Sequence, residues 1–509
     1  MKNLIFWLVL LASAPLLADG DHHVTGIGQE KLGTTNFAVS CSPAAQLEFN
    51  RAVAMLHSFW YDEAKKTFAH IAELDSDCVM AHWGVAMSLY RQLWATPPTL
   101  AELQEGREAL TRAQALPVKT DRERLYLDAA AQLYRSEDAD YGRRKQSYTQ
   151  AMAMVQAQFP DDPEANVFYA LALISTTDPH DKSYEQSKKA LTLLQKVLNQ
   201  IPDHPGVAHY IIHASDNPDL ATQGLAAARA YAHIAPAVPH ALHMPSHIFI
   251  RLGLWEDAAA SNLAAYLAAK DYAKDNFPGK VWDQELHFMD YLLYAYLQDG
   301  QNDKAQALWK EVAKIKKTYP ENSTSAYALA AIPARYFVER RAWTEAAKLS
   351  VAPQDFPWGK FGWCEAITQF ARGLGAARSG DIQEAQRSEA RLGVLRDGAK
   401  ADNNAYAADQ IEIQRLAVAA WIAQAYHREQ EAEALLRKAA DLEDVTEKDN
   451  VTPGPILPAR EMLGDLLLEL HRSQDAADAY RLSLQKSPKR LYGLQGLRLA
   501  EQQLQAQSN

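Results

Sequence analysis

The sequence predicts an all-α protein, a solenoid of stacked helical hairpins. Three observations support this prediction: small and aromatic residues recur at a spacing near 34 residues, helix-start signals occur along the chain, and strand patterns are nearly absent. A chain of 509 residues has room for about two to four domains or one long repeat array. The regular spacing favours the single array.

The composition is that of a folded, acidic protein. Hydrophobic residues make up 48% of the chain and charged residues 23%, which excludes wholesale disorder. Acidic residues outnumber basic ones by 63 to 52, and the net charge of −11 gives no general attraction for nucleic acid or an anionic membrane. Three cysteines are too few for a disulfide-built scaffold. We therefore expect no nucleic-acid partner.

Residues 1–18 have the pattern of an export signal. Lys2 is the only charge among them, and the run from Leu4 to Ala12 is apolar. This run is too short for a membrane-spanning helix, and cleavage just after Ala18 fits its end. We expect the mature protein to be periplasmic or secreted, without an integral membrane segment.

Residues 19–43 are polar and contain several glycines, so we expect a loose N-terminal arm. Cys41, at the end of this arm, and Cys78 flank the first predicted helical pair. An exported chain meets oxidising conditions, which favours a disulfide between them, and two free thiols are the alternative. Cys364 is far away in sequence and is expected to be a buried free thiol.

The clearest repeat unit lies near the C-terminus. Gly464 and Ala476 are small residues twelve positions apart, which lets the two helices of a hairpin approach closely. Tyr480 is expected to fill the space beside this contact, and Pro488 to end the second helix. This arrangement predicts a helix–turn–helix unit.

Comparable units recur upstream. Trp83 and Gly84 open one unit, and Ala64 and Phe68 close the unit before it. The clear units cover 44–75, 78–115, 239–270, 285–318, 326–350, 364–395 and 457–490. Less regular hairpins are expected at 120–160 and 163–200, and a loop between hairpins at 441–456.

These units resemble the tetratricopeptide-repeat (TPR) superfamily, whose unit is a helix–turn–helix of about 34 residues. The resemblance covers most of residues 44–498 and implies a right-handed α-solenoid of about nine to eleven hairpins over 44–509. It also implies a concave groove in which a peptide or protein partner would bind.

Proline after an N-cap residue marks three helix starts. The pairs are Ser42-Pro43, Asp162-Pro163 and Asn217-Pro218. Pro245 lies inside another predicted helix, where it removes a backbone donor, so we expect that helix to kink or restart.

Seven of the sixteen histidines lie between positions 204 and 247. His209 and His213 are four residues apart and therefore share one helix face, as do His243 and His247. The second pair follows the first by 34 residues, so both occupy equivalent positions in successive hairpins. Such helices stack roughly 10 Å apart. The four imidazoles should therefore face a common space within the histidine-rich hairpins 204–300.

In TPR proteins this stripe of the first helix generally faces the concave groove. The resemblance therefore implies a groove lined by His209, His213, Asp216, His240, His243, His247, Arg251, His287 and Asp290. Arg251 and Arg335 could clamp a carboxylate of the ligand there. The block from His240 to Trp255 is also similar to exported bacterial TPR proteins of unassigned activity.

Neutral imidazoles close to one or two carboxylates suit zinc, copper, iron or manganese. The candidate metal ligands are His209, His213, His243 and His247. The alternative is that these histidines bond a peptide ligand or one another. No HExxH, GxSxG or Walker phosphate-binding motif occurs, so no catalytic residue is assigned. The sequence thus supports first an exported binding or scaffold protein, and second a metal-binding protein or metal-dependent enzyme.

Overall fold

The computed structural model describes residues 30–91, 93, 97–135 and 140–508, and the predicted signal segment lies outside them. In chain order the helices are α1 (Pro43–His57), α2 (Tyr61–Leu74), α3 (Val79–Tyr90), α4 (Leu100–Gln114), α5 (Asp121–Leu133), α6 (Tyr141–Gln158), α7 (Pro163–Ser175), α8 (Glu185–Leu198), α9 (Pro205–Ala214), α10 (Ala221–Ile234), α11 (Pro239–His243), α12 (Pro245–Arg251), α13 (Trp255–Asn276), α14 (Asp283–Gln298), α15 (Asn302–Val312), α16 (Ser323–Glu339), α17 (Trp343–Ala346), α18 (Gly362–Ser379), α19 (Ile382–Ala401), α20 (Ala405–Ala425), α21 (Glu429–Val445), α22 (Ala459–Glu469), α23 (Ser473–Lys486) and α24 (Leu491–Ser508). The other regular elements among these residues are a 3-10 helix, η1 (Trp358–Lys360), and two paired strands, β1 (Val281–Trp282) and β2 (Thr318–Tyr319). The regular secondary structure of the described residues is almost entirely helical, as predicted.

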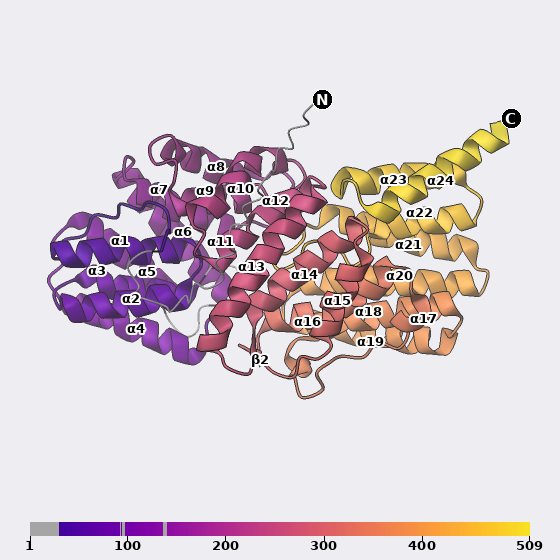
Figure 1. Cartoon of the computed structure of the whole chain (residues 1–509), viewed down its shortest axis with the longest axis horizontal. Helices are drawn as coiled ribbons and strands as arrows, with labels where there is room; N and C mark the ends of the chain where they lie inside the picture. Colours follow the sequence, from indigo (N-terminus) through magenta and orange to yellow (C-terminus); the bar gives the residue numbers. More distant parts are fainter. Residues whose placement is uncertain (1–29, 92, 94–96, 136–139, 509) are drawn as a thin grey trace, which may run out of the picture.

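The helices form one continuous array. They run from α1 at one end to the C-terminal helix α24 at the other (Figure 1). Consecutive helices pack against each other as hairpins, and alternate helices stack side by side, as α14, α16, α18 and α20 do. This is the solenoid that the repeats predict. Within the described residues we find no helix whose length and apolar character would let it span a bilayer.

The predicted hairpin contact is present. A Cβ atom added to Gly84 would lie 2.2 Å from the ring of Phe68, and one added to Gly464 would lie 2.8 Å from the ring of Tyr480. Glycine therefore allows an aromatic ring of one helix to pack directly on the backbone of its partner. These contacts join α2 to α3 and α22 to α23.

Helix starts follow the expected chemistry at two of three positions. Ser42 caps α1 and Asp162 caps α7, each accepting a hydrogen bond from a backbone N–H of the first turn. The third predicted start is wrong. Asn217 accepts a hydrogen bond from the backbone N–H of Leu220 at 2.9 Å, which closes a turn, and α10 begins only at Ala221.

The N-terminal arm is not loose from residue 30 onward. Phe37 is fully buried, and its ring contacts the rings of Phe49, Trp83, Tyr126 and Phe168. The prediction of a loose arm over 19–43 is therefore wrong for residues 30–42. A single buried aromatic ring attaches a polar segment to the first hairpins.

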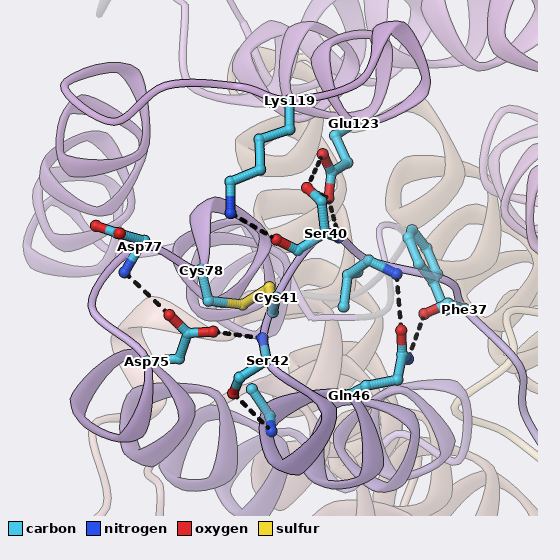
Figure 2. The surroundings of a disulfide bond; sticks show 12 residues. Phe37, Ser40, Cys41, Ser42, Gln46, Asp75, Asp77, Cys78, Lys119 and Glu123 are labelled. Carbon is cyan, nitrogen blue, oxygen red and sulfur yellow. Dashed lines mark hydrogen bonds between the residues drawn. A yellow bond between two sulfur atoms is a disulfide. The ribbon is translucent and has the colours of Figure 1, made fainter.

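Figure 2 shows how the arm meets the solenoid. Cys41 and Cys78 form a disulfide, which joins the end of the arm to the turn before α3. The backbone N–H of Ser40 donates to Glu123 of α5 at 2.7 Å, and Lys119 donates to the carbonyl oxygen of Ser40 at 2.9 Å. The arm is thus fixed to two hairpins at once.

Residues 446–458 connect α21 to α22, and we call them the crossing segment. They contact α14 and α16, which are first helices of successive hairpins; we call such helices the inner helices. Tyr291 of α14 donates to the carbonyl oxygen of Thr452 at 2.9 Å. Arg335 of α16 donates to the carbonyl oxygen of Pro455 at 2.8 Å. The sequence predicts a loop here but not these contacts, which bring the segment beside the histidine-rich helices.

Candidate metal centre

Six imidazoles gather where α9, α11, α12 and α14 meet. They belong to His209, His213, His240, His243, His247 and His287. The ring centroids of His213 and His247 lie 5.7 Å apart, and those of His240 and His243 lie 5.8 Å apart. The two predicted histidine pairs therefore meet across neighbouring hairpins, and two further histidines join them.

A helix break positions the second pair. Helix α11 ends at His243 and α12 begins at Pro245, so the chain restarts at the proline as expected. His240 still reaches the first pair across this break, because its ring lies 5.1 Å from that of His209.

The six histidines divide into two triads. The first triad is His209, His213 and His240, and the second triad is His243, His247 and His287. In each triad, one ring nitrogen of every histidine lies within 4.8 Å of the others. A single ion could therefore contact all three members of a triad.

In the second triad the Nε2 atoms of His243 and His247 lie 3.0 Å apart. The Nδ1–H of His243 donates to the side-chain oxygen of Asn262 at 2.6 Å. The amide nitrogen of Asn262 itself donates to the carbonyl oxygen of Ala258 at 2.8 Å, which identifies the oxygen as the acceptor. The proton of His243 is therefore on Nδ1, and its Nε2 presents a lone pair.

His247 has the same tautomer for a different reason. Its Nδ1–H donates to the carboxylate of Asp216 at 2.8 Å. Burial lowers the pKa of His243 well below its ordinary value and also lowers that of His247, where the bond to Asp216 opposes the shift. Both shifts favour the neutral imidazole. With both protons on Nδ1, two Nε2 lone pairs face each other, and a proton or a metal ion between them removes the repulsion.

The separation of these nitrogens fits a transition-metal ion. A tetrahedral ion about 2.0–2.1 Å from each nitrogen holds the nitrogens about 3.3 Å apart, so the separation of 3.0 Å requires a narrower angle of about 95° or a small shift of the rings. The third member, His287, is also a buried neutral imidazole, because burial and the neighbouring histidines His247 and His240 lower its pKa well below the ordinary value. Three neutral imidazoles are a common ligand set for such an ion.

Asp216 supports the triad from outside. Besides His247, its carboxylate accepts from Arg251 Nε at 2.8 Å and from Lys448 Nζ at 2.6 Å. Burial alone would raise the pKa of Asp216, but Lys448 and Arg251 hold it well below its ordinary value. Asp216 and Arg251 therefore lie beside the centre, where the carboxylate of Asp216 orients His247.

Asp290 and Arg335 are paired with each other rather than with the imidazoles. The two side chains form a buried ion pair with a distance of 3.2 Å between Arg335 Nε and Asp290 Oδ1. Arg335 also donates to two carbonyl oxygens of the crossing segment. The expectation that Asp290 joins the histidines, and that Arg335 clamps a ligand carboxylate, is therefore wrong. Asp290 is already bound by Arg335, and Arg335 is bound by Asp290 and by the crossing segment.

A cavity of about 660 Å³ borders the centre. His213, His247 and His287 line it, together with Asp216 and Lys448. The other three imidazoles do not reach it. The expectation of a groove wall formed by all the predicted histidines is therefore wrong, because the rings stack on one another and bury most of their surface.

Sequence reasoning missed a second buried cluster. Glu164 accepts from His57 Nε2 at 2.8 Å and from His204 Nε2 at 3.2 Å. Burial would raise the pKa of Glu164, but His204 and His57 lower it. The cluster satisfies its own hydrogen bonds, and the carbonyl oxygen of His57 accepts from His209 Nδ1 at 2.6 Å. The proline after His204 is a helix-start signal that points to this residue.

Comparisons with known proteins add little to this geometry. No protein-family model matches the chain, and no curated protein matches it. Among solved structures, yeast Tom70 is similar with a TM-score of 0.33 and 11% identity, covering 91% of this chain and 89% of that one. A monomeric mutant of IFIT1 with Gppp-AAAA has a TM-score of 0.37 and 12% identity, covering 83% and 90%. The TPR domain of P58(IPK) has a TM-score of 0.20 and 11% identity, covering 91% and 99%. The repeated hairpins, with an aromatic ring packed on glycine, give this chain an α-solenoid fold.

Proposed function

We propose that this protein is a metalloprotein that binds a first-row transition-metal ion through His243, His247 and His287. One observation carries the proposal: the Nε2 atoms of His243 and His247 lie 3.0 Å apart, while the Nδ1 atom of each ring bonds to an oxygen acceptor. Their Nδ1 protons are committed to Asn262 and Asp216, so neither ring can turn its proton toward the other. A bound cation removes the repulsion between the lone pairs and uses both as ligands.

The ligand chemistry narrows the choice of ion. Imidazole suits zinc, copper and iron, whereas calcium, magnesium and manganese favour oxygen ligands. No carboxylate belongs to either triad. Asp216 instead accepts the Nδ1 proton of His247, which raises the basicity of a ligand from outside the coordination sphere. Zinc, copper and iron are therefore the candidates.

The cavity lets a small molecule reach an ion bound at the centre. Three protein ligands leave at least one coordination position for a water molecule or a substrate atom. His247 and His287 both line the cavity, so a small molecule can approach the ion from that side. The other walls carry Lys145, Asp449 and Tyr406, which suit a polar ligand. We therefore assign the centre to metal-dependent chemistry on a small polar molecule.

The fold supports a further role at a coarser level. Solenoids of this type offer extended surfaces for protein partners, and a scaffold role is compatible with the metal centre. A peptide in the groove would have to displace the crossing segment, which already bonds to Tyr291 and Arg335. The pattern of residues 1–18 and the disulfide between Cys41 and Cys78 both support export to an oxidising compartment.

The metal content of the purified protein tests this proposal. The untagged protein is incubated in turn with zinc, copper(II) and iron(II), freed of excess metal by gel filtration, and assayed by elemental analysis. We expect retained metal, and a loss of about one ion per chain in His243→Ala and in His287→Ala.

An exposed histidine provides the matched control. His233 lies on the outer surface of α10, and His233→Ala should retain as much metal as the unaltered protein. Circular dichroism checks that each variant keeps its helical content. The absence of retained metal in the unaltered protein with all three ions would overturn the proposal.

A further inference from the structure

We infer that the centre is dinuclear, and that His209, His213 and His240 hold a second transition-metal ion beside the first. This inference rests on the proposed function, because it extends the same centre. The sequence suggests one site shared by two histidine pairs, whereas the structure completes each pair with a separate third histidine.

The first triad contains a contact between two Nε2 atoms like that of the second. The Nε2 atoms of His209 and His213 lie 3.1 Å apart, close to the 3.0 Å between His243 and His247. The Nδ1–H of His209 donates to the carbonyl oxygen of His57 at 2.6 Å. A carbonyl oxygen can only accept, so the proton of His209 is fixed on Nδ1 and its Nε2 presents a lone pair. This is the tautomer that metal ligation through Nε2 requires.

The third ligand of each triad comes from the next inner helix along the array. His240 of α11 completes the pair on α9, and His287 of α14 completes the pair on α11 and α12. Only the paired ligands follow the 34-residue repeat, which shifts His209 and His213 to His243 and His247. The third ligands, His240 and His287, are 47 positions apart and join their pairs through the packing of the helices.

The two triads form one centre. The rings of His213 and His247 contact each other, as do the rings of His240 and His243. His213 of the first triad and two histidines of the second line the same cavity. A small molecule in this cavity is therefore close to both ions. Two-metal centres use such an arrangement to bind one substrate from two sides.

The charge of the centre favours copper. All six ligands are imidazoles, which bind a metal ion as uncharged ligands, and the carboxylate of Asp216 is already paired with Lys448 and Arg251. Two buried divalent ions would lack compensating charge, which is costly. Copper is the ion that imidazole binds most strongly in the divalent series, and in its monovalent state it halves the buried charge.

The copper content of the unaltered protein tests this inference first. The untagged protein is loaded with copper under reducing conditions, freed of excess by gel filtration, and assayed for copper and protein. We expect about two copper ions per chain. After oxidation to copper(II), magnetic interaction between the two ions should reduce the integrated EPR intensity below the copper content.

Two variants assign the ions to the triads. His240→Ala alters only the first triad and His287→Ala only the second, and each should lower the content from about two ions to about one. His233→Ala is again the control. A variant that loses helical content is replaced by the corresponding asparagine variant.

The outcomes separate this inference from the proposed function. One ion per chain, lost in His287→Ala but kept in His240→Ala, would overturn the second site and leave the first intact. No bound metal at all would overturn both. About two ions with an uncoupled EPR signal would contradict a single dinuclear centre, because the ions would then lie apart.

Discussion

The ammonium group of Lys448 lies 2.6 Å from the carboxylate of Asp216, although 232 residues separate them in the chain. The same carboxylate oxygen accepts the Nδ1–H of His247. The crossing segment is thereby connected to a histidine of the second triad through one buried acid. Any displacement of this segment will change the environment of the centre.

Loss of this contact should destabilise the protein. Lys448→Met replaces a buried cation with an uncharged side chain of similar length, and Arg251 remains beside Asp216. We expect the free energy of unfolding to fall by about 1.5–3 kcal/mol, the range for a hydrogen bond to a charged group. Urea titration followed by circular dichroism measures it. Lys486→Met is the control, because Lys486 is partly exposed beside Asp444 and such pairs contribute less than about 1 kcal/mol. If both variants lost the same free energy of unfolding, the contact with Asp216 would contribute no more than an exposed ion pair.

Two glycines in helices should respond in opposite ways to alanine. A Cβ atom at Gly84 would lie 2.2 Å from the ring of Phe68, whereas Gly398 of α19 has no neighbouring atom within 4 Å of such a Cβ. Gly84→Ala should lower the free energy of unfolding by about 1–3 kcal/mol, as overpacked cores do. Gly398→Ala should raise it by up to about 1 kcal/mol, because alanine favours the helix. Thermal unfolding of the two variants compares them, and a stable Gly84→Ala would refute the proposed hairpin contact.

The repeat explains which parts of the structure could be predicted. Gly464 and Tyr480 belong to one hairpin and Gly84 packs on the helix that directly precedes its own, so local spacing identifies both contacts. The meeting of His213 with His247 was predictable for the same reason, because a 34-residue shift preserves the helix face.

Contacts between distant segments could not be predicted in this way. His287 completes the second triad only because α14 begins after a long helix and an irregular connection, whose length sets the register of that helix. Asp290 pairs with Arg335, which lies on the following inner helix, and no spacing rule selects this partner. Lys448 reaches Asp216 from a loop. The burial of Phe37 was missed because a single aromatic residue does not alter the polar composition of the arm.

Removal of the disulfide should release the N-terminal arm. The bond between Cys41 and Cys78 closes a loop with a sequence separation of 37 residues. Chain-entropy arguments give such a loop about 4 kcal/mol of stabilisation. We expect the variant with both Cys41→Ala and Cys78→Ala to unfold at lower urea concentration and to lose protection of arm amides against hydrogen exchange. The effect on the rest of the solenoid should be smaller.

A reductant provides the control for this prediction. Dithiothreitol should destabilise the unaltered protein toward the level of the double variant and leave the double variant unchanged. Cys364, which is a buried free thiol, should not contribute. A double variant that remained sensitive to dithiothreitol would show that another bond is responsible.

Arg335 should hold the crossing segment in place. Its guanidinium donates to the carbonyl oxygen of Pro455 at 2.8 Å and to that of Gly454 at 3.2 Å, and it pairs with Asp290. Arg335→Met removes these bonds and leaves Asp290 buried without its cation, which costs about 3–5 kcal/mol. We expect faster hydrogen exchange over residues 449–456, measured by mass spectrometry, before any change in the outer helices.

A variant of a neighbouring arginine, Arg340, is the control for a general loss of positive charge. Arg340 is exposed at the end of the same helix and bonds only to Tyr336 among the described side chains, so Arg340→Met should leave the exchange of the crossing segment unchanged. Tyr327→Phe provides a milder change, because it removes only the hydrogen bond of 2.6 Å to the Thr452 hydroxyl. It should cost about 0.5–1.5 kcal/mol and raise exchange over the same residues to a smaller extent. If Arg335→Met accelerated hydrogen exchange equally in every helix, Arg335 would stabilise the whole fold and not the crossing segment in particular. The prediction that Arg335 holds this segment in place would then be wrong.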